Sequence, residues 1–336
     1  MKFLVTCDPG LEDIAEREIK QADKNAKVER FFNFQGKLLV DSKAEKLIKL
    51  HSLHHVIKLL KTFYLKEASL EEIKKVLKKI EIPQMKDVEK FRVTSQRFGE
   101  HGFTSIDMQR IAGEVFLEKY KKKVDLENYD LNIRFDLVGR FGYVGLQLTD
   151  ESLYKRYEKA FNHTAAIKST IAYGMIVLSS VKPGEAMLDP MCGSGTIVLE
   201  AASLFKDKVR IMAGDIDEKC VKGTMENARL NGLEKYIEVK KMDATKLEEH
   251  VSSVDKIITN PPYGVRMEKR NLREFYRKFL ISSSKVLNDS GVLTMITLKA
   301  NMFRHVLFAT KRYKIIHERV VEAGGIYPHI FVLQKI

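Results

Sequence analysis

The residues best suited to chemistry in this chain are Asn-Pro-Pro-Tyr-Gly at positions 260–264. The exocyclic amine of a nucleobase is a poor nucleophile, because its lone pair is delocalised into the ring. The side-chain oxygen of Asn260 and the carbonyl of Pro261 are two acceptors that would localise this lone pair, and the prolines fix the carbonyl's direction. Tyr263 offers a face on which a base can stack. An ordinary strand-to-loop turn is the alternative, but the pattern favours methyl transfer to a nucleobase amine.

A glycine-rich turn precedes this motif by about 65 residues, read from the sequence, within the stretch 185–202. A short apolar strand runs into Asp-Pro-Met-Cys-Gly-Ser-Gly-Thr at 189–196, and an amphipathic helix follows. The glycines let the backbone approach a ligand closely, and the helix start offers free N–H groups to an anion. Val198 stands where a dinucleotide-binding turn carries its third glycine, which disfavours an NAD-dependent oxidoreductase.

Three further strands are predicted at 209–214, 237–241 and 255–259. The first runs into Asp215, which suits a grip on ribose hydroxyls, and the second runs into Asp243, which can accept a hydrogen bond from an adenine amine. The third delivers Asn260. Ligands of open α/β sheets bind along the carboxyl edge, so the sequence predicts that these groups surround one ligand. Each aspartate alone would equally fit a surface turn.

The order of these motifs resembles the Rossmann-fold, S-adenosylmethionine-dependent amino-methyltransferases. The resemblance implies S-adenosyl-L-methionine as cofactor and Asn260, Pro261 and Tyr263 as catalytic residues. It places the methionine end near Asp189, the ribose at Asp215 and the adenine at Asp243. The implied cofactor-binding residues are Asp189, Cys192, Gly193, Gly195, Thr196, Asp215, Ile216, Asp243, Ala244 and Asn260.

The cysteines do not suggest a second chemistry. Cys192 lies in the cofactor turn and not beside a target base, which disfavours a covalent mechanism. Cys7, Cys192 and Cys220 are too few and too dispersed for a disulfide framework or a metal site, so we expect no metal and a reducing cytoplasm.

Positive charge is concentrated after the catalytic motif. The chain has a formal net charge of +13, and residues 251–336 hold 15 Lys/Arg against 6 Asp/Glu. Four arginines spaced by three and four residues would form one stripe on a helix, and they are Arg266, Arg270, Arg273 and Arg277. A stripe beside an active site suits phosphate contacts, and a solvated helix face is the alternative.

The N-terminal half predicts a different module. Helices are expected at 11–22, 47–60 and 105–120. The segment 91–107 reads Phe-Arg-Val-x-x-x-Arg-x-Gly-x-His-x-Phe-x-Ser-x-Asp and resembles a THUMP domain, preceded by a ferredoxin-like module. The resemblance implies binding to the tRNA acceptor arm, with the candidate contacts Arg92, Arg97 and His101. A loop-ordering role explains His101 equally well.

Together these features predict an α/β protein with four parts: a ferredoxin-like α+β module (1–65), a THUMP domain (66–150), a linker (151–170) and a Rossmann-fold methyltransferase domain (171–336). The layout resembles the tRNA guanine-N2 methyltransferases that act on position 6 of the acceptor stem. The related enzymes for guanine 10 usually carry Asp-Pro-Pro-Tyr, so Asn260→Asp is expected to retain more activity than Asn260→Ala. We expect a cytoplasmic monomer with no membrane span and no protein partner.

Two alternatives and one unassigned loop remain. Adenine N6 in DNA or rRNA suits the same motif, and a non-catalytic RNA-binding protein is disfavoured by the intact Gly193, Asp215 and Asn260. His-Thr-Ala at 163–165 stands where relatives often have His-Pro-Ala, and the sequence assigns it no role.

Overall fold

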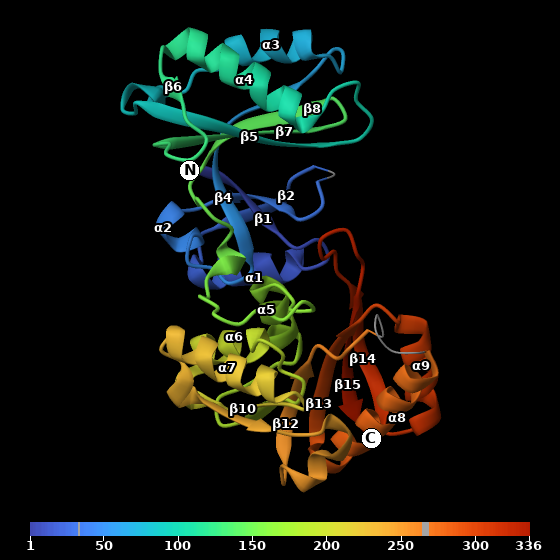
Figure 1. The fold of residues 1–336 in the computed structure, drawn as a ribbon. Helices are drawn as coiled ribbons and strands as arrows, with labels where there is room; N and C mark the ends of the chain where they lie inside the picture. The colour runs from blue at the N-terminus through green and yellow to red at the C-terminus, as the bar shows by residue number, and fades with distance from the viewer. Residues whose placement is uncertain (33, 264–268) are drawn as a thin grey trace. The chain divides into compact units, whose positions relative to one another are not determined.

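The computed structural model describes residues 1–32, 34–263 and 269–336. Within them the chain forms two compact units (Figure 1). Unit 1 contains Met1–Cys7 and Glu16–Leu153, and unit 2 contains Asp8–Ala15 and Tyr154–Ile336. The chain therefore passes from one unit to the other three times. Among the described helices, none combines the length and apolar composition needed to cross a membrane.

Unit 1 is built on one sheet of eight strands in the order β2-β3-β1-β4-β8-β7-β5-β6. The strands are β1 (Lys2–Cys7), β2 (Lys27–Arg30), β3 (Lys37–Asp41), β4 (Leu53–Tyr64), β5 (Lys90–Phe98), β6 (Lys123–Val124), β7 (Leu131–Val138) and β8 (Phe141–Gln147). β4 pairs with β1 on one side and with β8 on the other. It thereby joins the first three strands and the last four into one continuous sheet.

Helices pack on this sheet through apolar faces. They are α2 (Ala44–Leu47), α3 (Leu70–Lys78), α4 (Ser105–Tyr120) and the later part of α1 (Glu12–Ala22), whose first residues belong to unit 2, with a 3-10 turn η1 (Pro83–Lys86). The predicted helix at 105–120 is confirmed. It begins there because the Thr104 hydroxyl accepts the N–H of Asp107 at 3.2 Å while the Asp107 carboxylate accepts the N–H of Thr104 at 2.8 Å. Ile73 of α3 and Phe116 of α4 share a core with Phe135 of β7.

The predicted helix at 47–60 is wrong, because most of this range belongs to strand β4. Apolar residues spaced three and four apart, such as Leu53, Val56 and Leu60, imitate a helical stripe. In the structure two register shifts produce this spacing, one next to Leu53 in the pairing with β1 and one at Leu60 in the pairing with β8. Each adds a residue to β4 and interrupts the alternation of a regular strand.

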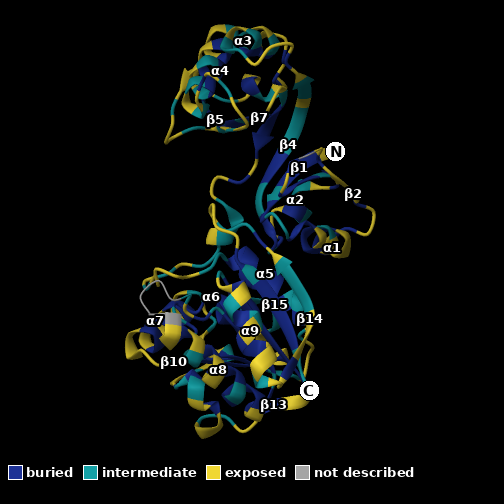
Figure 2. Cartoon of the chain, turned by 90° about the vertical axis from the view of Figure 1, so that its right-hand side faces the viewer, coloured by how far each residue is buried: buried dark blue, intermediate teal, exposed yellow. Residues whose placement is uncertain are grey.

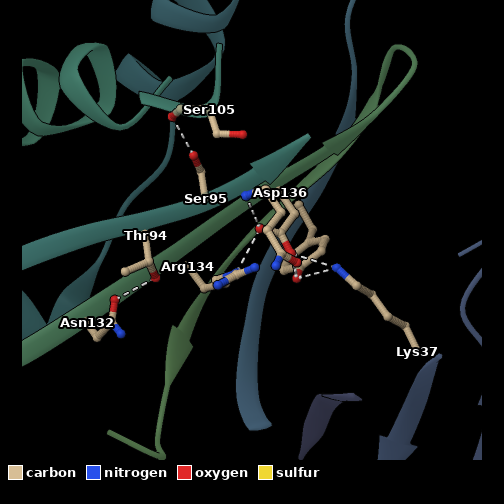
Figure 3. Close-up of polar contacts among 9 residues, drawn as sticks. Lys37, Thr94, Ser95, Ser105, Asn132, Arg134 and Asp136 are labelled. Carbon is tan, nitrogen blue, oxygen red and sulfur yellow. Dashed lines mark hydrogen bonds and ion pairs between the residues drawn. The ribbon is translucent and has the colours of Figure 1, made fainter. Parts of the chain in front are cut away.

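A buried ionic network joins β3 to β5, β7 and β8 in unit 1 (Figure 3). The Asp136 carboxylate accepts Lys37 Nζ at 2.6 Å and Arg134 Nε at 2.7 Å. The Tyr143 hydroxyl donates to it, and so does the backbone N–H of Gln96 at 2.8 Å. Burial alone would raise the pKa of Asp136, but the charges of Lys37 and Arg134 outweigh it and hold this pKa below its ordinary value.

Unit 2 is built on a seven-stranded sheet in the order β11-β10-β9-β12-β13-β15-β14. The strands are β9 (Ala186–Asp189), β10 (Arg210–Asp215), β11 (Ile237–Lys241), β12 (Val254–Thr259), β13 (Leu287–Thr297), β14 (Tyr313–Val320) and β15 (His329–Lys335). The neighbouring strands from β11 to β13 pair in parallel, and β15 is antiparallel to both of its neighbours. The strands predicted at 209–214, 237–241 and 255–259 are confirmed to within one residue as β10, β11 and β12.

Helices cover both faces of this sheet, which gives the expected Rossmann-type layers. They are α5 (Ser169–Leu178), α6 (Thr196–Phe205), α7 (Glu218–Leu230), α8 (Lys269–Val286) and α9 (Ala300–Thr310). The short 3-10 turns are η2 (Leu153–Lys155), η3 (Lys206–Lys208), η4 (Glu234–Tyr236) and η5 (Ala244–Glu249). Met187 of β9 joins the core under α5 and α6, and its neighbour Leu188 joins the core under α8 and α9. Figure 2 shows the resulting pattern, with buried strands and helices exposed on their outer sides.

The segment Asp8–Ala15 is an integral part of unit 2. The Asp8 carboxylate accepts Lys168 Nζ at 2.9 Å and also the hydroxyl of Thr170. Leu11 and Ile14 join the same apolar core as helix α5. Unit 2 is therefore discontinuous in the sequence.

Candidate active site

A cavity of about 620 Å³ opens in unit 2 where β9, β10, β11 and β12 end. All residues that the sequence analysis assigned to the cofactor and to the amine line it, with the exception of Gly195. Its acidic lining residues are Asp189, Asp215, Asp217 and Asp243, whereas the lining residues within the described part of the chain include no lysine or arginine. In a chain of net charge +13, this acidic lining favours a ligand that carries positive charge.

The glycine turn after β9 shapes one wall of the cavity. Gly193 and Gly195 have φ angles of 55° and 81°, a region that favours glycine. A Cβ at Gly195 would also lie 2.9 Å from the Thr224 side chain. Gly195 does not line the cavity itself, but it turns the chain so that Thr196 does, and α6 starts there with unpaired N–H groups. Lys159 Nζ donates to the Thr196 hydroxyl at 2.6 Å.

Asp189 is almost fully buried at the cavity floor. Its Oδ1 accepts the Thr259 hydroxyl at 2.7 Å and the backbone N–H of Met191 at 3.2 Å. Burial raises the pKa of Asp189 to about 7, although both hydrogen bonds act in the opposite direction. Within the described residues it has no ion-pair partner. Asp189 therefore has a structural role, because it connects the glycine turn to the end of β12, and it also lines the cavity.

Cys192 is buried in the same turn. Its sulfur lies 3.4 Å from the Thr224 hydroxyl. Burial raises the pKa of the Cys192 thiol well above its ordinary value, so the thiol stays protonated. A protonated, buried thiol is not a nucleophile, which agrees with a packing role at the cofactor turn.

Asp215 is held rigidly at the end of β10. Its Oδ2 accepts the backbone N–H of Gly193 at 3.0 Å, and its Oδ1 accepts the N–H of Asp217 at 3.0 Å. Each carboxylate oxygen retains a further lone pair for a ligand hydroxyl. The next residue, Ile216, lines the cavity with 65% of its surface exposed, and it offers an apolar wall to a flat ring.

Asp243 lies at the end of β11 and also has a structural task. Its Oδ1 accepts the backbone N–H and the hydroxyl of Thr245, both at 2.8 Å, and so caps η5. Its own N–H donates to His250 Nε2 at 3.2 Å. Within the described chain the other carboxylate oxygen has no hydrogen-bond donor, so it is available to a ligand. Ala244 lines the cavity beside it.

Asn260 follows β12 with its amide engaged at both ends. Nδ2 donates to the carbonyl of Ala165 at 2.8 Å, and Oδ1 accepts the Tyr263 hydroxyl at 2.5 Å. Burial raises the pKa of Tyr263, so this hydroxyl stays protonated and able to donate. Behind the motif, the hydroxyl of Tyr276 donates to the carbonyl of Pro262 at 3.2 Å. Hydrogen bonds from the side chains of Asn260, Tyr263 and Tyr276 thus hold the described part of this loop.

The arginine stripe lies only partly in the described chain. Arg266 falls outside the described residues. Arg270 and Arg273 of α8 line a second hollow of about 460 Å³ and have no side-chain partner among the described residues. Arg277 forms a two-point pair with Glu274, at 2.8 and 2.9 Å. The inward face of α8 packs on the sheet through Leu272, Tyr276 and Phe279, with Phe275 partly buried beside them.

In unit 1 the three candidate RNA contacts are already engaged. Arg92 stacks on Tyr129, with its guanidinium carbon 3.8 Å from the ring centroid. Arg97 donates to the carbonyl of Gly99 at 3.1 Å. The ring nitrogens of His101 lie 3.1 and 2.7 Å from two glycine carbonyls, which gives it the loop-ordering geometry.

Sequence reasoning missed the part of the site that lies on the linker. His163, Thr164 and Ala165 line the cavity, and Ala165 contacts Asn260 through its backbone. Asn227 and Asn231, four residues apart near the end of α7, hold the linker's backbone. The sequence pointed to this loop only through the asparagine spacing and through His-Thr-Ala at 163–165, to which it assigned no role. Among the described residues, no cluster suitable for a metal ion is found.

Two family comparisons match the chain. The family described as RMKL-like, methyltransferase domain, matches residues 156–329, and the THUMP domain family matches residues 67–147. Two similar proteins are named tRNA (guanine(6)-N2)-methyltransferase. The one from Thermus thermophilus is 32% identical over 98% of this chain and 98% of its own length. The one from Methanocaldococcus jannaschii is 31% identical over 99% of this chain and 100% of its own length.

A solved structure agrees with these matches. The crystal structure of TrmN from Thermus thermophilus has a TM-score of 0.87 at 31% identity, covering 100% of this chain and 99% of that one.

Proposed function

The chain belongs to the family of THUMP-domain tRNA (guanine-N2-)-methyltransferases, and we propose that it methylates the exocyclic N2 amine of guanine 6 in the acceptor stem of tRNA. The observation that carries this proposal is the cavity, which runs from the glycine turn to Asn260 in one unit. One end suits a nucleoside cofactor and the other presents acceptors for an amine.

The enzyme uses S-adenosyl-L-methionine, and the cavity suits this group. Its acidic lining suits a cationic sulfonium, and its volume lies in the usual range for small-molecule sites. Asp215 would hold the ribose, Asp243 and Ala244 the adenine amine, and Ile216 the ring face. Asp189, Cys192, Gly193, Gly195 and Thr196 would form the methionine end. When bound, the cofactor supplies a methyl group already activated for displacement.

Asn260 and Pro261 orient the amine in this proposal. The amide oxygen of Asn260 and the carbonyl of Pro261 accept its two N–H groups and direct its lone pair towards the cavity. Tyr263 and Phe275 line the same end and offer faces for the guanine ring. Alignment is the main requirement, because the methyl group needs no further activation. Asn260 cannot take up a proton at neutral pH, so the amine proton leaves to water after transfer.

RNA is the substrate class, and we further propose how it is held. Arg270 and Arg273 would bind phosphates next to the cavity, since both are free of other partners in the described chain. Arg92, Arg97 and His101 would contribute from unit 1 to binding of the acceptor arm. A paired guanine must be exposed by fraying or flipping before it reaches the pocket. We also propose that the protein acts as a monomer in the cytoplasm, since its three buried cysteines form no disulfide within the described chain.

Nucleoside mass spectrometry tests the proposal. Unmodified tRNA is incubated with enzyme and labelled cofactor, then digested. We expect labelled N2-methylguanosine, and we expect none from a matched tRNA in which base pair 6 is replaced by one without guanine on that strand. Labelled methyladenosine, or label that persists in the substituted tRNA, would overturn the substrate assignment.

A further inference from the structure

The linker residues 156–167, here called the strap, are bound along their backbone by two asparagines. Asn231, at the end of α7, donates to the carbonyl of Glu158 at 2.8 Å and accepts its N–H at 3.1 Å. Asn227 makes the same pair with Phe161, at 2.8 and 3.1 Å. An amide side chain has one donor edge and one acceptor edge, so each asparagine binds the strap as a neighbouring strand would.

Two side chains of the strap add to this hold. Arg156 pairs with the buried carboxylate of Glu200 at 2.8 Å. The ring of Phe161 packs so closely on α7 that a Cβ at Gly223 would lie 2.2 Å from it. Only glycine at position 223 leaves this space. The strap is therefore fixed before it reaches the cavity.

The far end of the strap sets the orientation of Asn260. Residues 163–167 line the cavity, and the carbonyl of Ala165 accepts Asn260 Nδ2 at 2.8 Å. A carbonyl oxygen can only accept, so the amide nitrogen must face the strap and the amide oxygen must face away from it. The Tyr263 hydroxyl donates to that oxygen at 2.5 Å. An amide oxygen has two lone pairs, so one is left to accept an N–H of the substrate amine in the proposed mechanism.

We propose that the strap is a positioning element for methyl transfer and that it requires a hydrogen-bond donor at position 260. The inference rests on the proposed role of Asn260. An ionised aspartate at position 260 would place a carboxylate oxygen against the Ala165 carbonyl oxygen. Both oxygens are acceptors, so they would repel each other and the hydrogen bond to the strap would be lost. This reverses the expectation that Asn260→Asp retains more activity than Asn260→Ala. The aspartate should work only when protonated, because only then does it donate to Ala165.

The first test asks whether the strap acts through Asn260. Asn231→Ala removes one anchor of the strap and touches no cavity residue. Single-turnover methylation with saturating tRNA and cofactor should slow by about 3- to 10-fold, the range expected when the loss of two neutral hydrogen bonds to Glu158 is only partly transmitted to Asn260. In an Asn260→Ala background the same change should have no further effect. Asn288→Ala is the matched control, since Asn288 binds Asp255 at 2.7 Å away from the strap.

The second test uses pH. A carboxyl group whose neutral form makes the hydrogen bond has a raised pKa, so its active form is present below that pKa and is lost as pH rises. The rate of Asn260→Asp relative to the parent should therefore increase as pH falls, by up to about tenfold per pH unit. The other titratable groups that line the cavity are the same in both enzymes, so dividing the variant's rate by the parent's rate at each pH removes their contribution. These groups are His163, Asp189, Cys192, Asp215, Asp217, Cys220, Asp243 and Tyr263.

The outcomes separate the two proposals. If Asn260→Ala methylates at the parental rate, the proposed role of Asn260 fails and the strap proposal fails with it. If Asn260→Ala is slow but Asn260→Asp follows the parent at every pH, the catalytic role stands and the donor requirement is wrong. Equal slowing by Asn231→Ala in the parent and in the Asn260→Ala background would make the strap merely structural.

Discussion

Asp136 in unit 1 and Asp189 in unit 2 are buried to the same degree, but only Asp136 has positively charged neighbours in the described chain. Asp136 in unit 1 is 0% exposed and is surrounded by Lys37, Arg134, a hydroxyl and a backbone N–H. Asp189 in unit 2 is 1% exposed and has two neutral donors, with no ion-pair partner in the described chain. Accordingly, the pKa of Asp136 lies below its ordinary value and that of Asp189 rises to about 7.

The difference teaches how to separate structural polar groups from functional ones in this molecule. In unit 1 the protein supplies counter-charges for its own carboxylate, because that carboxylate holds strands together. In unit 2 the described lining of the acidic cavity includes no lysine or arginine, which fits the proposed cofactor because its sulfonium carries the positive charge. Changes in the first region should therefore affect stability, and changes in the second should affect activity.

The largest expected effect is on the network of unit 1. Asp136→Ala leaves Lys37 and Arg134 buried without a counter-charge, and it should lower the free energy of unfolding by about 3–5 kcal/mol. Lys37→Met is the matched variant and should cost less, because Arg134, Tyr143 and the N–H of Gln96 still satisfy the carboxylate. Denaturant unfolding of the full chain measures both. A smaller loss for Asp136→Ala than for Lys37→Met would contradict the structural role.

The cavity should give the opposite result. Asn260→Ala is expected to reduce turnover by about 10²–10³-fold, as for the loss of one preorganised polar group at a reacting centre. Its thermal unfolding midpoint and its affinity for cofactor and tRNA should stay close to those of the parent. Single-turnover rates with both substrates saturating, alongside calorimetry, separate these quantities. If Asn260→Ala lowers stability but leaves the rate of methyl transfer unchanged, the proposed difference between the two regions is wrong.

The two aspartates should also give opposite pH dependence of stability. Asp189 binds a proton in the folded state between its ordinary pKa of 3.8 and about 7, so its contribution is full at low pH and is lost as pH rises to about 7. Asp136 contributes above its ordinary pKa, and this contribution is lost as pH falls through the lowered value. Asp189→Asn keeps an acceptor for Thr259 and should flatten the first slope in unfolding measurements from acidic to neutral pH. Parallel curves for parent and variant would count against the raised pKa.

The smallest expected effect concerns RNA phosphates. Changing Arg270 and Arg273 to Gln should weaken tRNA binding and reduce the slope of log K against log salt by about 0.7–0.9 per lost contact. Arg277→Gln is the internal control, because Arg277 is already paired with Glu274 and should change the slope less. Cofactor affinity should not change in either variant. If no variant changes the salt dependence of tRNA binding, these arginines do not contact phosphates and simply form a solvated face of α8.

Much of unit 2 could be predicted because its strands and polar residues follow a simple rule. β10 and β12 are largely buried, apolar strands, and their carboxyl ends carry Asp215 and Asn260, so the parallel arrangement of the sheet places these residues at one edge. In unit 1 the same kind of reasoning failed at β4. Its two register shifts give the apolar residues of the strand a helix-like spacing. The segment forms a strand because it hydrogen-bonds to β1 and β8, and these partners cannot be read from the local sequence.

The strap could not have been predicted for a different reason. Ala165 and Asn260 are 95 residues apart, and the contact is made by a backbone carbonyl. The side chain of alanine is apolar, so the residue type at position 165 gives no indication of a hydrogen bond to Asn260. Only the folded linker shows that position 165 matters through its backbone.

The discontinuity of unit 2 has a consequence for biosynthesis. Leu11 and Ile14 leave the ribosome early, but the helix that covers them lies near Thr170, and Asp8 is separated from Lys168 by 160 residues. At ordinary translation speeds this distance corresponds to about 10–30 s. During that interval a strand of unit 1 can already pair, while the apolar segment just after it waits uncovered. Translation rate and holding chaperones should therefore influence the yield of folded protein more than its final stability would suggest.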